Sequence, residues 1–173
     1  LAAVEAFFGA GADRRLDVAS VRAGFADVAS PGRLERVRSA PSVFVDAAHN
    51  PHGARALATA LGGYFTFDEI AVVLGVLQDK DANGIVEALV PVASAFYVTQ
   101  SQSDRAVPAE ALADLVIAHA GPDAVVPYSS FEHAVQDARV WASAAPRRAV
   151  VVTGSITLVG EAIELAAAEK WKQ

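Results

Sequence analysis

Three side chains that could do chemistry lie close together in the segment VFVDAAHNPHGARALATAL, residues 43–61. A short apolar run ends at Asp46, and His49 and Asn50 follow just before a helical pattern. Asn50 and Pro51 favour a helix start, because Asn caps free backbone amides and Pro suits the first turn. Such amides, with an imidazole beside them, attract an anion, and the Asp46 carboxylate could accept hydrogen bonds from a ribose. The segment predicts either a nucleotide or anion contact, or only a cap and a turn residue.

The spacing of Asp46, His49 and His52 also raises the question of a metal site. His52 would fall at the second position of the helix and point away from His49, and no fourth ligand is evident. We therefore predict no metal site built from this chain alone.

A second polar segment, LQDKD at residues 77–81, places a lysine between two carboxylates after an apolar run. Asp81 is suited to cap the next helix. Lys80 could act as a point charge for a phosphate, or it could be an ordinary solvated loop charge. Asp79 and Lys80 are therefore candidate contacts for a nucleotide.

A third segment, TGSITLVG at residues 153–160, has a glycine at a turn and Ser155 at a helix start. This arrangement favours binding of a small anion. It matches neither the dinucleotide fingerprint Gly-x-Gly-x-x-Gly nor the phosphate loop Gly-x-x-x-x-Gly-Lys-Ser/Thr. The chain by itself therefore has no cradle for a whole nucleotide, and a simple dinucleotide-dependent dehydrogenase is disfavoured.

The elements that must position these residues alternate regularly along the chain. Short apolar runs predict strands, and each is followed by a helical pattern at a repeat of roughly 25 to 30 residues. The predicted strands are 43–45, 70–76, 95–99, 124–126 and 149–153. The predicted helices are 51–61, 82–90, 108–120, 130–142 and 157–171. Runs such as AVVLGV and AVVVTG are continuously apolar, which is typical of strands covered on both faces.

Residues 34–37 alternate between apolar and polar and are too close to residue 43 for a parallel crossover, so we predict an antiparallel edge strand there. The predicted fold is α/β: a doubly wound, mostly parallel, Rossmann-like sheet of about six strands, five parallel plus one antiparallel edge strand, with helices on both faces. Ligands of such sheets bind at the carboxyl ends of the strands. Because Asp46, His49, Lys80 and Ser155 all follow strands, we expect one shared site.

Composition excludes several classes of protein. The chain has 173 residues, of which 53% are hydrophobic, and a net charge of −6, which argues against nucleic-acid binding. No apolar run approaches the roughly 18 residues of a membrane span, so we expect no membrane partner. Cysteine is absent, which fits a reducing compartment, and we expect a cytoplasmic protein.

The first residues predict a separate unit. Val4 and Phe7 suit the last turns of a helix that Gly9 and Gly11 would end, and residues 17–29 predict a short amphipathic helix. SPGR at residues 30–33 is the expected linker. We therefore expect residues 1–30 to be the remnant of a preceding domain plus linker, and residues 31–173 to be a whole second domain.

The segments PGRLERV…VFVDAAHNPHGARAL, VLGVLQDKD and VVTGSITLVGE resemble the carboxy-terminal domain of folylpolyglutamate synthases, including the bifunctional dihydrofolate synthase form. These enzymes are relatives of the Mur ligases. The resemblance covers Pro31 to about Glu161 in the same order. The preceding residues resemble the last part of that family's amino-terminal ATPase domain.

The resemblance implies an ATP-dependent ligase that activates a folate or dihydropteroate carboxylate as an acyl phosphate and joins it to L-glutamate. The implied cofactors are ATP and Mg²⁺, with Mg²⁺ held mainly by the amino-terminal ATPase domain, which is the expected partner. The pterin pocket would lie mainly outside this chain, so dihydrofolate synthase activity and polyglutamation are not separated.

The resemblance also implies roles for particular residues. Arg33 would lie near the ATP phosphates and Asp46 near the ribose. His49 and Ser155, the implied catalytic residues, would place the incoming glutamate and the reacting groups. The remaining implied contacts of the nucleotide cleft are Asn50, Asp79 and Lys80. Two alternatives stay open: a Mur-type peptidoglycan ligase, and a non-catalytic α/β module that binds a small anion or a partner protein.

Overall fold

The computed structural model describes residues 2–8, 16–26 and 30–171, which fall into two compact units, Leu1–Pro31 and Gly32–Gln173. The first unit contains helices α1 (Ala2–Phe8) and α2 (Val18–Ala26). The predicted stops at Gly9 and Gly11, and the predicted helix end at 27–29, lie outside the described residues. That this unit ends an ATPase domain stays a prediction.

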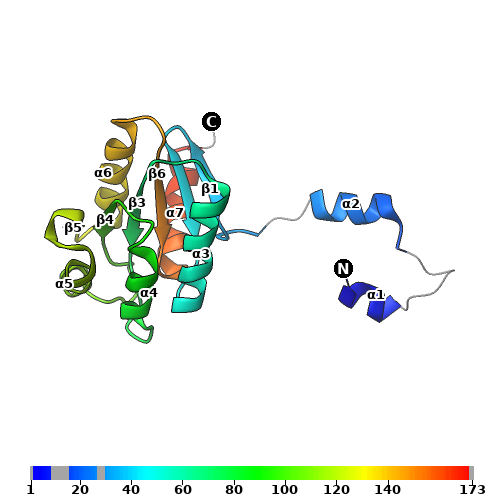
Figure 1. Ribbon diagram of the computed structural model, residues 1–173, viewed down its shortest axis with the longest axis horizontal. Helices are drawn as coiled ribbons and strands as arrows, with labels where there is room; N and C mark the ends of the chain where they lie inside the picture. The colour runs from blue at the N-terminus through cyan, green and yellow to red at the C-terminus, as the bar shows by residue number, and fades with distance from the viewer. Residues whose placement is uncertain (1, 9–15, 27–29, 172–173) are drawn as a thin grey trace. The chain divides into compact units, whose positions relative to one another are not determined.

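The second unit alternates strands and helices in the predicted order (Figure 1). Its strands are β1 (Glu35–Ser39), β2 (Ser42–Asp46), β3 (Glu69–Leu74), β4 (Ala95–Val98), β5 (Val125–Pro127) and β6 (Arg148–Thr153). Its helices are α3 (Pro51–Tyr64), α4 (Ala82–Leu89), α5 (Ala109–Ala120), α6 (Phe131–Ser143) and α7 (Ile156–Ala168), with a 3₁₀ turn at Pro122–Ala124.

One six-stranded sheet runs through this unit in the order β1-β2-β6-β3-β4-β5. β1 pairs with β2 in the antiparallel sense, and all other neighbours are parallel, which confirms the predicted fold class. The last strand in the sequence, β6, lies between β2 and β3. The chain therefore builds the two flanks of the sheet before it fills the middle.

Helices cover both faces of the sheet. Side chains of α3, α4 and α5 form one buried cluster with the sheet, and side chains of α6 and α7 form the other. In the view of Figure 1, α3 and α4 lie in front of the sheet and α7 behind it. β3 and β6 are buried along almost their whole length, because each carries apolar side chains toward both layers.

The boundaries differ from the predicted ones by a few residues. β1 begins at Glu35 rather than at Leu34, because Leu34 adopts a left-handed backbone with φ of 43°. α3 continues to Tyr64, past the apolar pattern that ended at Leu61. Neither difference moves a strand end that carries a candidate site residue.

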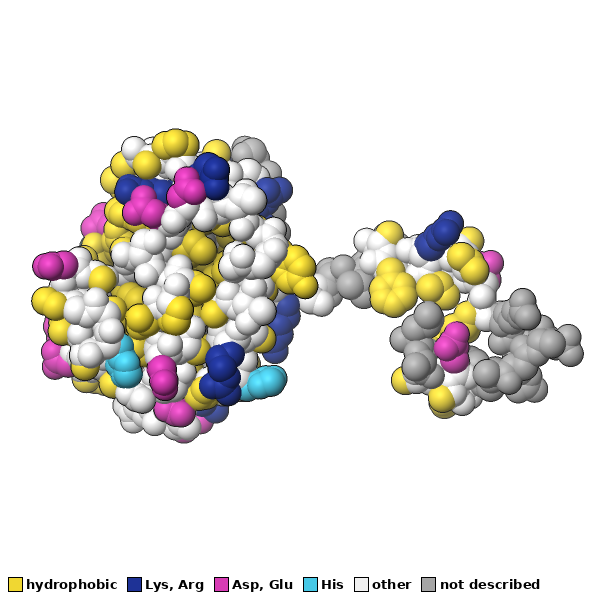
Figure 2. All heavy atoms as spheres, viewed as in Figure 1, with side chains coloured by type: hydrophobic (Ala, Val, Ile, Leu, Met, Phe, Trp, Pro, Cys, Tyr) yellow, Lys and Arg dark blue, Asp and Glu magenta, His cyan; other side chains and the backbone are white. Residues whose placement is uncertain are grey.

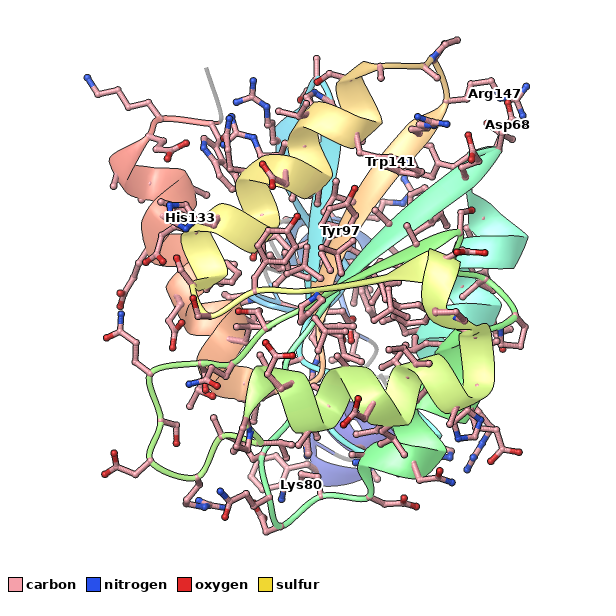
Figure 3. The ribbon with its side chains drawn as sticks, turned by 90° about the vertical axis from the view of Figure 1, so that its left-hand side faces the viewer. Asp68, Lys80, Tyr97, His133, Trp141 and Arg147 are labelled. Carbon is pink, nitrogen blue, oxygen red and sulfur yellow. The ribbon has the colours of Figure 1, made fainter. Side chains whose placement is uncertain are left out.

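On the face of the second unit that Figure 2 shows, charged side chains lie mainly around the rim, and hydrophobic side chains lie nearer the middle. Lys80 lies at the opposite end of the sheet from the ion pair of Asp68 and Arg147, whose Oδ1 and Nη2 atoms are 2.8 Å apart (Figure 3). Within the described ranges, no helix has both the length and the apolar character needed to cross a bilayer.

Candidate active site at the carboxyl ends of the strands

The ends of β2 and β6 lie side by side, with Asp46 paired to Thr153 in parallel register. The buried Thr153 hydroxyl donates to the Asp46 carbonyl at 2.7 Å, and the Gly154 amide donates to the Ala48 carbonyl at 3.1 Å. These bonds join the loop after β2 to the loop after β6. The structure therefore brings Asp46, His49 and Ser155 to one edge of the sheet.

The end of β6 also touches the end of β3 through a close backbone approach. The Gly75 amide donates to the Thr153 carbonyl at 3.2 Å. Gly154 has φ of 105°, and a Cβ placed on it would lie 2.5 Å from the Gly75 carbonyl oxygen. Only glycine fits there, because a side chain would meet backbone on the neighbouring strand.

The Asp46 carboxylate is half-buried and holds two backbone amides. Its Oδ1 accepts from Ala48 at 2.9 Å, and its Oδ2 accepts from Leu34 at 2.8 Å. A carboxylate has about four acceptor positions, so each oxygen keeps one lone pair for a further donor. Asp46 is therefore both a loop anchor and an available acceptor.

One of the two ring nitrogens of His49 is held by the loop after β2. Its Nδ1 lies 2.9 Å from the Ala47 carbonyl oxygen, which can only accept, so Nδ1 carries the proton. When the ring is neutral, Nε2 then bears a lone pair. The half-buried ring is thus oriented by its own loop, with Nε2 available to a ligand.

Asn50 is exposed and caps α3: its Oδ1 accepts from the Gly53 amide at 2.8 Å. The predicted cap is confirmed. Asp81 caps α4 in the same way, accepting from Gly84 at 2.9 Å. A Cβ on Gly84 would lie 2.6 Å from Pro51 Cγ, so the first turns of α3 and α4 are packed against each other.

Ser155 is buried, with 1% of its surface exposed. Its Oγ caps α7 by accepting from the Leu158 amide at 3.1 Å and lies 3.1 Å from the Thr157 hydroxyl. Thr157, which is exposed, donates to Ser101 at 3.1 Å. Thr157 is thus the exposed residue that contacts Ser155 here, and the sequence reasoning did not single it out.

Asp79 forms ion pairs with two cations. Its Oδ2 lies 2.7 Å from Lys80 Nζ, and its Oδ1 contacts Arg105 Nη2. The side-chain hydrogen bonds from Lys80 and then Arg105 lower the pKa of Asp79 to about 2. Arg105 was not among the predicted site residues, although its place after β4 put it on the expected edge. Because two cations pair with one carboxylate, the cluster of Asp79, Lys80 and Arg105 carries a net positive charge.

Arg33 is exposed and makes no ion pair or hydrogen bond with any other described residue. Its neighbours are tied down: the Gly32 carbonyl accepts from Ala47 at 2.8 Å, and the Leu34 amide donates to Asp46. Arg33 therefore lies beside the end of β2 with its guanidinium available.

A cavity of about 200 Å³ lies at the same edge, lined by Gln100, Ser101, Gln102, Ser129, Ser130, Phe131, Glu132 and Glu161. Glu161 Oε1 accepts from the Gln102 amide at 2.8 Å. Burial raises the pKa of Glu161. The sequence reasoning missed Glu161 because it lies inside α7 rather than after a strand.

Acidic and imidazole side chains of the described residues do not gather in threes at any point that could hold a metal ion. Asp46 and Asp79 have their carboxylates engaged by amides and by cations, respectively. Residues 2–8, 16–26 and 30–171 therefore offer no group of side chains that fits a Mg²⁺ site.

Residues 32–156 match the family model described as Mur ligase, glutamate ligase domain. The chain is 50% identical over 94% of its length to the dihydrofolate synthase/folylpolyglutamate synthase of Mycobacterium tuberculosis, of which it covers 36%. It is 31% identical over 84% of its length to the corresponding Escherichia coli protein, of which it covers 33%. The chain thus spans about a third of these curated relatives.

The solved structures that this chain resembles also include folylpolyglutamate and dihydrofolate synthases. The M. tuberculosis folylpolyglutamate synthase complexed with ADP and AMPPCP superposes with a TM-score of 0.90 at 48% identity, covering 95% of this chain and 38% of that one. A bifunctional synthase from Yersinia pestis, with Mn, AMPPNP and L-glutamate bound, gives a TM-score of 0.76 at 27% identity, covering 88% and 36%. By the match over residues 32–156, this chain belongs to the Mur ligase family and contains its glutamate ligase domain.

Proposed function

We propose that this chain is the carboxy-terminal domain of an ATP-dependent ligase that adds L-glutamate to folates, with dihydropteroate as a further acceptor in a bifunctional enzyme. The observation that carries the proposal is the meeting of Asp46, His49 and the start of α7 at the ends of two paired strands. Relatives with the same domain are named for this activity, and solved ones hold ADP or L-glutamate.

The reaction has two steps. A carboxylate oxygen of the acceptor attacks the γ-phosphorus of ATP, giving an acyl phosphate and ADP. The amine of glutamate then attacks the acyl carbon, and phosphate leaves with the electron pair of the broken C–O bond as the amide forms. The protein must neutralise the phosphates and hold the two substrates in line.

The geometry of this edge supports the proposed nucleotide contacts. Arg33 has a free guanidinium, which suits the phosphates. Asp46 retains acceptor capacity for the ribose hydroxyls beside its two amide bonds. Asn50 and the Asp79–Lys80 pair are secondary candidates, because Asn50 Oδ1 caps α3 and the charges of Asp79 and Lys80 pair with each other.

The proposed contacts of glutamate are His49 and the start of α7. The oriented Nε2 of His49 can accept a hydrogen bond, or a proton, from the incoming ammonium group. Ser155 is buried, so its contribution reaches the ligand through the Thr157 hydroxyl. His49 is then the catalytic residue of the pair, and Ser155 is a positioning residue.

Other parts of the reaction belong to a preceding ATPase domain, which supplies the phosphate loop and the Mg²⁺ ligands. Residues 32–171 contain no phosphate loop and no carboxylate group fit for Mg²⁺. The chain alone should therefore release no phosphate from ATP in the presence of L-glutamate and a folate. Glutamate-dependent phosphate release by the purified chain would contradict the proposal that another domain supplies the phosphate loop and the Mg²⁺ ligands.

The test is a ligation assay on the full-length protein with ATP, tetrahydrofolate or dihydropteroate, and radiolabelled L-glutamate. His49→Ala should lower kcat at least about 100-fold, the lower range for a general acid–base residue. His52→Ala is the matched control: it lies three residues further along, exposed on α3, and should stay within about twofold of the natural protein. No ligation by the natural protein would refute the function, and equal loss in both variants would refute the site.

A further inference from the structure

The segment Gly32–Leu34 is held against the end of β2 by two hydrogen bonds, one to Asp46 and one to the next residue, Ala47. The Ala47 amide donates to the Gly32 carbonyl at 2.8 Å, and the Leu34 amide donates to Asp46 Oδ2 at 2.8 Å. Arg33 lies between these two attachment points. Its backbone is therefore fixed on both sides, although its side chain is exposed.

The backbone of this segment adopts conformations that need such support. Gly32 has φ of 68° and Leu34 has φ of 43°, so the chain enters the left-handed region twice within three residues. A leucine rarely adopts this conformation without a local reason. The side chain of Leu34 packs against the core cluster of α3–α5, and its backbone amide donates a hydrogen bond to the Asp46 carboxylate. Together these contacts hold the unusual turn.

Asp46 is the point where three segments meet. Its Oδ2 holds Leu34 before β1, and its Oδ1 holds Ala48 in the loop after β2. The Ala48 carbonyl accepts in turn from Gly154 at 3.1 Å. Binding a ribose does not require the bonds that the Asp46 carboxylate makes to Leu34 and Ala48, so these bonds point to a second, structural role for Asp46.

We propose that Asp46 is a positioning residue for Arg33: its carboxylate fixes the Gly32–Leu34 turn and so aims the Arg33 guanidinium at the nucleotide phosphates. This rests on the proposed function, because it takes the ligand to be a nucleotide. It adds a coupling between two residues that would otherwise act separately, one on the ribose and one on the phosphates. Without the Asp46 carboxylate, Leu34 relaxes toward negative φ and Arg33 turns away.

The test is a double-mutant cycle on the full-length protein, with ADP and adenosine binding measured by calorimetry. The readout is the ratio of ADP affinity to adenosine affinity, from which any ribose contact cancels. Arg33→Ala should lower this ratio about 10- to 100-fold, as expected for a charge-assisted phosphate contact. Asp46→Ala, which leaves no acceptor for the Leu34 amide, should lower it by a similar factor, and the double variant should be no lower than Arg33→Ala alone.

Two results would overturn the proposal: an unchanged ratio in Asp46→Ala, or two effects that multiply in the double variant. Failure of the natural protein to bind ADP would refute the proposed function instead.

A nucleotide-free measurement on the unaltered chain keeps the proposal testable should Asp46→Ala fail to fold. Amide hydrogen exchange at Leu34 should be slow, although the neighbouring Arg33 is exposed. Asp46→Ala should speed exchange at Leu34, whereas Asp81→Ala, which removes a similar carboxylate bond to Gly84, should leave it unchanged. Fast exchange at Leu34 in the unaltered chain would contradict the proposal that the Asp46 carboxylate holds the Leu34 amide.

Discussion

Gly154→Ala tests the close approach between β6 and β3 on which the site depends. Gly154 has φ of 105°, which an L-residue adopts only with strain of roughly 1–2 kcal/mol. The new Cβ would also lie 2.5 Å from the Gly75 carbonyl oxygen and 2.9 Å from Leu74 Cδ1. Overpacking of this kind destabilises by about 1–3 kcal/mol. The expected loss in the free energy of unfolding is therefore about 2–5 kcal/mol.

Gly160→Ala provides the matched control. Gly160 lies within α7, and no atom beyond its own helix lies within 4 Å of the position where its Cβ would be. Alanine in a helix interior is favoured over glycine by about 0.5–1 kcal/mol, so this variant should be equal to or slightly more stable than the natural chain.

The assay is urea unfolding followed by circular dichroism, with the free energy of unfolding obtained by linear extrapolation. At about 2–4 °C per kcal/mol for a chain of this size, Gly154→Ala should also lower the melting temperature by about 5–20 °C. Equal midpoints for Gly154→Ala and the natural chain would refute the reasoning, because the strand ends would then have room for a side chain.

Three further predictions concern individual side chains. Thr153→Val removes a buried hydroxyl bound to the Asp46 carbonyl and should lower the free energy of unfolding by about 1–2 kcal/mol; an unchanged urea midpoint would contradict it. The pKa of Asp79 is lowered from 3.8 to about 2, so its stabilising effect is present above pH 3.8 and lost as the pH falls toward 2. Lys80→Gln, which removes the largest cause, should raise that pKa in a carboxyl NMR titration, and an unmoved titration would refute the pairing. Burial, and then the hydrogen bond to Asp137, raises the pKa of Tyr128 from 10.0 to about 12, so its stabilising effect is present below pH 10 and lost toward pH 12. Asp137→Asn should lower the Tyr128 pKa, as measured by absorbance at alkaline pH, and an unchanged value would exclude that bond.

The mostly parallel sheet with one antiparallel edge strand could be predicted from the sequence, because the residue patterns of single strands indicate it. β3 and β6 read as continuous apolar runs, and both are buried on two faces. β1 lies too few residues before β2 for a crossover, and the two strands pair antiparallel. The placement of β6 between β2 and β3 carries no such local signal, because it depends on contacts between distant parts of the chain.

The site was predictable in its location but less so in its details. Asp46, His49 and Ser155 lie at one edge because strand ends of a parallel sheet must meet there. The burial of Ser155 and the exposure of Thr157 depend on how α7 packs, which the sequence pattern does not contain. The left-handed backbone at Leu34 was also invisible, since leucine gives no hint of a positive φ.

The middle position of β6 has a consequence for biosynthesis. While the ribosome is still making residues before Arg148, β2 and β3 have no shared neighbour, and each flank of the sheet exposes an unpaired edge. The sheet can close only after its sixth strand has left the exit tunnel, so folding of this domain is expected to wait for the synthesis of β6. A ribosome stalled before that strand would hold two open half-sheets, a form suited to recognition by chaperones.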